Sequence, residues 1–139
     1  MSALTISFWL YLVAAIATIL IGLLYALRRR IMPYHIKALE TEWDEIDPNY
    51  QLLLKALLNG GGYFGLATGL FMLTLLLIPF QNGEAWAGYA IGLIGLIGSL
   101  PLGLIVYEVK TRTAGDPPLS VMIILNLILA AGLAAFVFS

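Results

Sequence analysis

The sequence predicts an all-α integral membrane protein, an antiparallel four-helix transmembrane bundle with an amphipathic cytoplasmic helix between spans 1 and 2. Composition is the first reason, because 61% of the 139 residues are hydrophobic and only 11% are charged, which is too apolar for a soluble domain. The second reason is that the apolar residues form four stretches, each near the roughly 20 residues that cross a bilayer. These spans cover about residues 6–27, 60–80, 85–107 and 119–138 of a single domain, residues 1–139.

The basic residues predict how the bundle is oriented. All seven Lys and Arg residues lie in two polar segments, one between the first and second spans and one between the third and fourth. In a four-span protein these two segments share one side of the membrane, and such an excess of basic residues marks the cytoplasmic side. We therefore expect both termini to lie outside, and the membrane to be a prokaryotic inner (plasma) membrane.

The cytoplasmic connector, about residues 28–59, predicts one amphipathic helix and the beginning of another. Asp47 followed by Pro48 is a typical helix start, because the carboxylate accepts from free N–H groups and proline suits the first helical position. The helix that begins there is expected to continue into the second span. The amphipathic helix before it is predicted by apolar residues at three- and four-residue spacing: Met32, Ile36, Leu39, Trp43 and Ile46.

Small residues four positions apart predict close helix packing in the second and third spans. Such ladders form grooves that allow two helix backbones to approach, and packing is what holds membrane helices together. Because the short turn at about residues 81–84 already joins these two spans, we expect them to pack on each other rather than to form a dimer interface. The predicted packing residues are Gly61, Gly65, Gly69, Gly95 and Gly103.

One polar residue on each span lies at a similar depth. At 1.5 Å per residue, these residues lie about 10–14 Å from the cytoplasmic ends of their spans. One interpretation is an interhelical hydrogen-bond layer, which is favoured because Ser and Thr are routinely satisfied by carbonyls of their own helix. The other interpretation is a polar pocket for a small ligand. The residues of this candidate polar layer are Thr18, Thr68, Ser99 and Asn126.

The sequence predicts no catalytic, cofactor or metal site. The chain has no Cys, which excludes thiol catalysis and thiolate metal sites. Its single histidine, His35, lies near Glu40 and Glu42, but a metal needs three or four convergent ligands. A net charge of −1 argues against nucleic acid as a partner. We therefore expect a protein that is not an enzyme and carries no cofactor.

In length and number of spans the chain is similar to the small multidrug resistance transporters. Those transporters use a membrane-embedded glutamate in the first span, and the first span here, about residues 6–27, contains none. No ionisable residue lies deep in the other spans either, although proton-coupled transport usually places one there. The chain is therefore not assigned to that family.

Two functions follow from these observations. The first is an accessory subunit or regulator that acts through a membrane-protein partner or a homo-oligomer in the lipid bilayer. The alternative is binding or transport of a small lipophilic or neutral molecule within the bundle. A cavity at the depth of Thr18 and Asn126 would favour binding, and a dry packed centre would favour the partner role. The candidate partner surface consists of Glu40, Glu42, Trp43, Asp44, Glu45 and Asp47.

Overall fold

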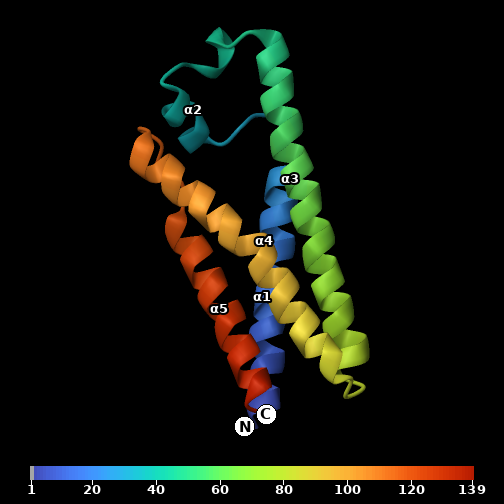
Figure 1. Ribbon diagram of the computed structural model, residues 1–139. Coiled ribbons are helices and arrows are strands. Elements are labelled where there is room, and N and C mark those ends of the chain that lie inside the picture. Colours follow the sequence, from blue (N-terminus) through green and yellow to red (C-terminus); the bar gives the residue numbers. More distant parts are fainter. Residues whose placement is uncertain (1) are drawn as a thin grey trace.

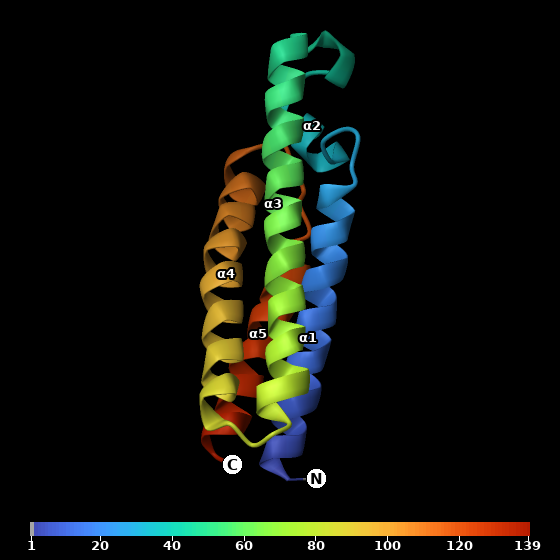
Figure 2. The ribbon, with the colours of Figure 1, turned by 90° about the vertical axis from the view of Figure 1, so that its right-hand side faces the viewer.

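The computed structural model describes residues 2–139, and the described residues form helices and turns without any strand. Four helices are long and apolar enough to cross a membrane. They lie side by side, and both termini are at one end of the molecule (Figures 1 and 2). The elements are α1 (Ala3–Ala26), α2 (Pro33–Leu39), the 3-10 helix η1 (Trp43–Glu45), α3 (Pro48–Leu75), the π-helix η2 (Leu76–Phe80), α4 (Ala85–Arg112) and α5 (Leu119–Val137).

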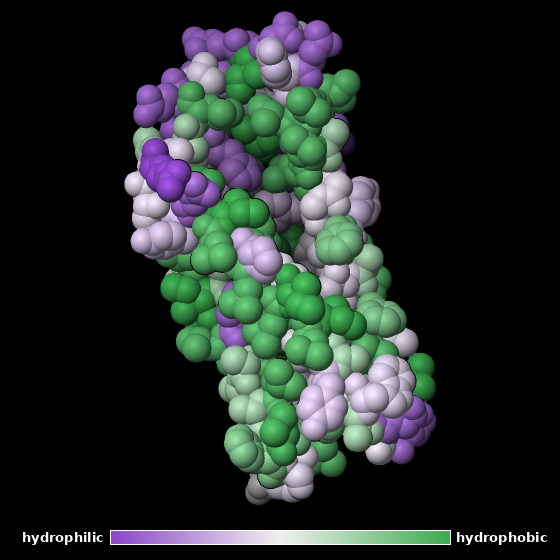
Figure 3. Space-filling view, viewed as in Figure 1, coloured by the Kyte–Doolittle hydropathy of each residue, from purple (hydrophilic) through white to green (hydrophobic). Residues whose placement is uncertain are grey.

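The two ends of the bundle differ in what they carry. The hairpin end, at the bottom of Figure 1, holds the termini and the turn between η2 and α4. The connector end holds α2, η1 and the loop between α4 and α5. Hydrophobic side chains cover most of the length between the two ends, and hydrophilic residues gather at the connector end (Figure 3).

Two of the long helices extend further at the connector end than the predicted spans. α3 begins at Pro48 rather than near residue 60, and α4 continues to Arg112. The predicted start of α3 is present, because Oδ1 of Asp47 accepts a hydrogen bond from the Asn49 backbone N–H at 2.9 Å and Pro48 is the first helical residue. The three glycines at 60–62 do not interrupt the helix.

The connector does not form the single continuous helix that the apolar periodicity predicts. α2 ends at Leu39, where Glu40 adopts a left-handed conformation with a φ of 52° that an α-helix does not continue through. The chain then turns through η1, and the Gln51 side-chain amide donates to the carbonyls of Trp43 at 2.8 Å and Ile46 at 3.0 Å. The periodic apolar residues are therefore divided between two short elements instead of sharing one helix face.

The hairpin-end half of the bundle contains the packed core. Its largest fully buried side chains include Tyr11, Met72 and Leu76. Two hydroxyls from α1 tie other helices into this core: Tyr11 donates to the carbonyl of Gly88 in α4, and Ser7 donates to the carbonyl of Gly132 in α5, both at 2.9 Å. These bonds satisfy polar groups where the interior offers no water.

The glycine-rich face of α3 packs on α1. A Cβ added at Gly62 would lie 2.2 Å from the backbone nitrogen of Ala26, and one added at Gly22 would lie 2.3 Å from that of Leu66. At Gly69 the corresponding distance, to the backbone nitrogen of Ile19, is 2.8 Å. The prediction that this groove takes α4 is therefore wrong. The physical reason is that α1 has small residues of its own at the matching positions, so the two backbones can approach.

The other predicted packing residues have separate partners. Gly61 faces open space, since nothing lies within 4 Å of a Cβ added there, whereas a Cβ at Gly65 would lie 3.5 Å from Cα of Gly22. On α4, a Cβ at Gly95 would lie 2.5 Å from a Leu129 methyl carbon, and one at Gly103 would lie 3.6 Å from Nδ2 of Asn126. The small residues of α4 at these two positions thus face α5.

Candidate functional site

A cavity of about 550 Å³ lies in the connector-end half of the bundle. α3 and α4 diverge from their turn towards the connector end (Figure 1), and the cavity occupies the space between them. A hollow is visible at this place in the space-filling view (Figure 3). All four long helices and the α2 segment contribute lining residues, so the cavity belongs to the bundle as a whole.

The cavity has a floor, a roof and an open side. Met72 of α3 and the buried Gly95 of α4 lie at its deep end, next to the packed core. Its roof contains Met32, just before α2, and Pro117 of the loop before α5, and both are buried. The side between α3 and α4 is open. Lining residues on these two helices are also exposed, by 66% at Leu57, 73% at Phe64 and 57% at Ile105.

The candidate polar layer is only partly joined by hydrogen bonds. Ser99 donates to Oδ1 of Asn126 at 2.7 Å, so the predicted contact between these two residues is present. Nδ2 of Asn126 also donates to the Met122 carbonyl at 2.8 Å. Thr18 and Thr68 instead donate to carbonyls of their own helices, at 2.8 Å and 2.9 Å. A single layer across all four helices is therefore not formed.

The cavity nevertheless brings most of this set together. Thr18, Thr68 and Ser99 line it from three different helices. Asn126 is not a lining residue and lies behind Ser99, to which it is bonded. Three of the four residues predicted to lie at one depth therefore border the cavity, and only the pair Ser99 and Asn126 is hydrogen-bonded between helices.

The remaining polar side chains of the cavity are at the roof. The hydroxyls of Tyr25, near the end of α1, and Tyr34, in α2, form a hydrogen bond with each other. Burial raises the pKa of the Tyr34 phenol, and this bond raises it further. His35 also lines the roof, and Nδ1 of its ring accepts a hydrogen bond from the Met32 backbone N–H at 3.4 Å. Burial lowers the pKa of His35, so the ring favours its neutral form.

Two sets of contacts hold the roof in place. The first is at the end of α1, where the Asn59 amide lies 2.9 Å from the carbonyl of Tyr25, 2.8 Å from that of Ala26 and 3.0 Å from that of Arg28. The last turn of a helix leaves carbonyl acceptors open, although the Tyr25 carbonyl also lies 3.5 Å from the Arg28 backbone nitrogen. Asn59 therefore fixes the segment that leads from α1 to the roof.

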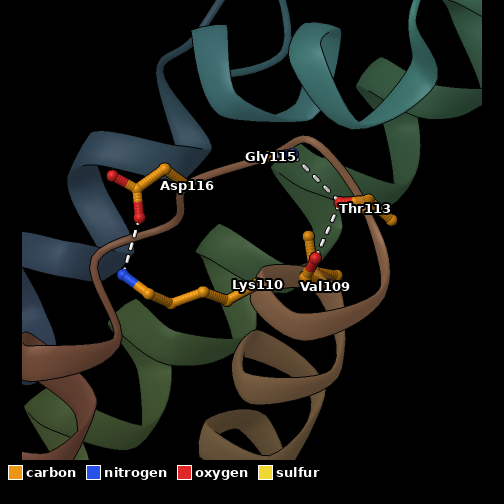
Figure 4. A network of polar contacts seen from close by, with 5 residues as sticks. All are labelled: Val109, Lys110, Thr113, Gly115 and Asp116. Atoms are coloured by element: carbon orange, nitrogen blue, oxygen red, sulfur yellow. Dashed lines mark hydrogen bonds and ion pairs between the residues drawn. The ribbon is translucent and has the colours of Figure 1, made fainter.

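The second set is in the loop after α4 (Figure 4). Thr113 donates to the Val109 carbonyl at 2.6 Å and accepts from the Gly115 N–H at 3.1 Å. Lys110 pairs with Asp116 at 2.6 Å, and its hydrogen bond lowers the pKa of this carboxyl. A Cβ added at Gly115 would lie 2.7 Å from the Tyr34 carbonyl oxygen. The loop therefore supports α2 directly.

Sequence reasoning did not identify several of these residues. Gly22 and Ala26 in α1 are small residues four positions apart, which is a signal that the sequence does contain. Tyr25, Tyr34 and Asn59 carry no comparable signal, because their partners are on other elements and depend on how the connector folds back.

The candidate partner surface lies apart from the cavity. Its acidic side chains are exposed, and Trp43 is partly exposed. One ion pair joins this surface to the segment after α1, between Arg30 and Asp44 at 3.6 Å, and both side chains are largely in solvent. Such a pair contributes little to stability.

No protein-family model, curated protein or solved structure matches this chain. The fold and the cavity define its class: an all-helical protein with four helices long and apolar enough to cross a membrane and an apolar cavity between α3 and α4.

Proposed function

We propose that this chain is an integral membrane protein that binds a small lipophilic molecule in the cavity between α3 and α4. The observation that supports the proposal most is the cavity itself, whose volume of about 550 Å³ lies within the range of about 300–1,000 Å³ of small-molecule sites. Its lining is largely apolar. A packed centre would have favoured the accessory or regulatory role instead.

The bundle is proposed to be antiparallel in the membrane, with both termini outside and the connector end in the cytoplasm. The seven Lys and Arg residues, all at the connector end, support this orientation. α2 and η1 then form an amphipathic segment at the cytoplasmic surface, in the inner membrane of a prokaryote. A C-terminal alkaline phosphatase fusion is expected to be active and a C-terminal fluorescent-protein fusion dark, and the opposite pattern would contradict this orientation.

In this orientation the open side of the cavity faces the hydrocarbon of the cytoplasmic leaflet. A lipophilic molecule then reaches the site laterally from the bilayer. Because lipid tails are as apolar as the lining, the ligand gains packing contacts and hydrogen bonds rather than the hydrophobic effect. Affinity therefore depends on how well the ligand fills the cavity.

Two neighbouring glycines provide a matched test. A side chain at Gly61 would project into the cavity without a clash, because Gly61 is a lining residue with nothing within 4 Å of an added Cβ. Gly60 also has nothing within 4 Å but does not line the cavity. Gly61→Leu should therefore block binding, and Gly60→Leu should not.

Binding can be measured with a small lipophilic diazirine that reacts on illumination, with the full chain in liposomes. Labelling of peptides from the cavity should saturate in the parent and in Gly60→Leu, and should be lost in Gly61→Leu. Labelling of lipid-facing peptides should increase without saturation in all three proteins. If cavity peptides behave like lipid-facing peptides in the parent, the proposed function is wrong.

The second candidate function is the accessory or regulatory role. The exposed acidic side chains of the candidate partner surface favour it, since they are carried beyond the bundle by the extended start of α3. Copurification from native membranes should then recover a stoichiometric partner. Replacement of Glu40, Glu42 and Glu45 by Gln should release it, while replacement of the exposed Glu84 at the hairpin end serves as the control.

A further inference from the structure

We infer that the ligand is an uncharged amphiphile with a long hydrocarbon chain, whose polar oxygen accepts a hydrogen bond from Nε2 of His35 at the roof. Its chain extends towards Met72 at the floor. This inference rests on the proposed binding function and adds the charge, the shape and the direction of the ligand.

The lining excludes a charged ligand. None of the side chains that line the cavity is Asp, Glu, Lys or Arg. An ion in an apolar site is costly unless an opposite charge or several hydrogen bonds compensate it. A carboxylate, phosphate or ammonium group would find no such partner among the lining residues, whereas a hydroxyl, ester or carbonyl oxygen needs only one donor.

The available donors are at the roof, where the Tyr25–Tyr34 bond uses only one of the two phenolic hydrogens and the ring of His35 adds an N–H. Deeper in the cavity, the hydroxyl hydrogens of Thr18, Thr68 and Ser99 are used within the protein. At the roof, Nδ1 of His35 accepts from the Met32 N–H, so the neutral ring carries its proton on Nε2. Nε2 has no hydrogen-bond partner among residues 2–139, and it is not a buried atom, because none of the buried side-chain nitrogens or oxygens there lacks a partner.

The length of the cavity fits an extended hydrocarbon chain. The lining residues of α3 extend from Leu57 to Met72, which corresponds to about 22 Å of helix at 1.5 Å per residue. A hydrocarbon chain can therefore lie along α3 between the roof and the floor.

The test uses the full chain in lipid nanodiscs with diazirine derivatives of hexadecanol and of hexadecanoic acid, each with the reactive group at the chain terminus. Hexadecanol should label the cavity saturably, with cross-links near Met72 and Gly95, and with an affinity at least about five-fold above that of the acid. Preference for the acid, or cross-links at the roof, would overturn the inference.

The role of His35 is tested by two substitutions. His35→Leu removes the donor and should weaken hexadecanol binding about five-fold, as expected for one hydrogen bond. His35→Gln keeps a donor close to the position of Nε2 and should stay within about two-fold of the parent. Equal binding by all three proteins would overturn the inference. The label positions in the parent test the direction of the chain even if a variant does not fold.

The two proposals fail in different ways. If the small lipophilic diazirine does not label the parent saturably, the cavity is not a binding site. If it saturates and Gly61→Leu blocks it, but hexadecanol shows no preference and no dependence on His35, the cavity binds another lipophilic molecule and only the present inference is wrong.

Discussion

Two glycines of α4, one beside the packed core and one lining the cavity, have opposite roles. In the hairpin-end half, Gly92 of α4 is covered, since a Cβ there would lie 2.7 Å from the Tyr11 hydroxyl and 2.9 Å from a Leu133 methyl carbon. In the connector-end half, Gly98 of the same helix has nothing within 4 Å of an added Cβ and lines the cavity. The first glycine allows contact with a neighbour, and the second leaves space.

This difference shows that glycine spacing does not by itself identify an interface. What decides the role of each glycine is whether a neighbouring helix lies against its face of α4. Gly92 faces Tyr11 of α1 and Leu133 of α5, whereas Gly98 lines the cavity that opens where α3 and α4 separate (Figure 1).

The largest expected effect comes from placing one side chain at both positions. Gly92→Leu should lower the free energy of unfolding by about 3 kcal/mol, because the added atoms meet Tyr11 and Leu133 in a filled core. Gly98→Leu should change it by less than about 0.5 kcal/mol or stabilise the helix slightly. Unfolding in mixed micelles with increasing SDS measures both. Equal destabilisation would mean that both halves are packed.

A smaller effect is expected from the hydrogen bond that ties α1 to α4 in the packed half. Tyr11→Phe removes the hydroxyl that donates to the Gly88 carbonyl and should cost about 1–1.5 kcal/mol, close to the upper limit for membrane hydrogen bonds. Tyr63→Phe, at an exposed position of α3, is the control and should be neutral. A neutral Tyr11→Phe would show that water or lipid reaches this site.

Asn126→Leu tests the boundary between the halves. Ser99 keeps its hydrogen bond to the Gly95 carbonyl when Asn126 is replaced, so no donor is left without a partner. The free energy of unfolding should fall by about 0.6 kcal/mol, the average for such a bond. Binding of the lipophilic diazirine should be retained, because Asn126 does not line the cavity. Lost binding with unchanged stability would give Asn126 a direct role.

The smallest effect is the pH dependence of the roof. The pKa of His35 is lowered in the folded chain, so below the unfolded value of about 6.5 the unfolded chain binds more protons. Stability should therefore fall as the pH falls from about 6.5 towards the lowered pKa, and this contribution should level off below it. The difference in Tm between about pH 7.5 and about pH 5.5 should be smaller in His35→Gln than in the parent.

The spans could be predicted because hydrophobicity and length determine them directly. The helix start at Asp47 and Pro48 and the contact between Ser99 and Asn126 were also predictable, since each follows from a local rule about capping or polar groups at depth. The helix start depends only on neighbouring residues of one segment, and the Ser99–Asn126 contact depends only on two residues at the same depth.

The wrong predictions concern which face each helix presents to its neighbours and where the connector helix ends. With three glycines at 60–62, spacing alone does not show that Gly62 faces α1 while Gly61 faces the cavity. The left-handed Glu40 that divides the connector has no residue-type signal, because this conformation is unusual for glutamate. The walls of the cavity depend on which face each glycine presents and on where the connector folds back, and neither follows from residue spacing.

α3 and η2 together form a helix that is longer than the hydrocarbon core of a bilayer is thick. At 1.5 Å per residue the 33 residues Pro48–Phe80 extend about 50 Å, well beyond a hydrocarbon core of about 30 Å. The part of α3 from Leu57 to Met72 lines the cavity, and the start of α3 at Pro48 follows the acidic segment outside the bundle. Suppose that a partner binds the start of α3 more tightly in one tilt of the helix, and that the proposed ligand fills the cavity better in the same tilt. Each of the two molecules then raises the affinity of the protein for the other by the same factor.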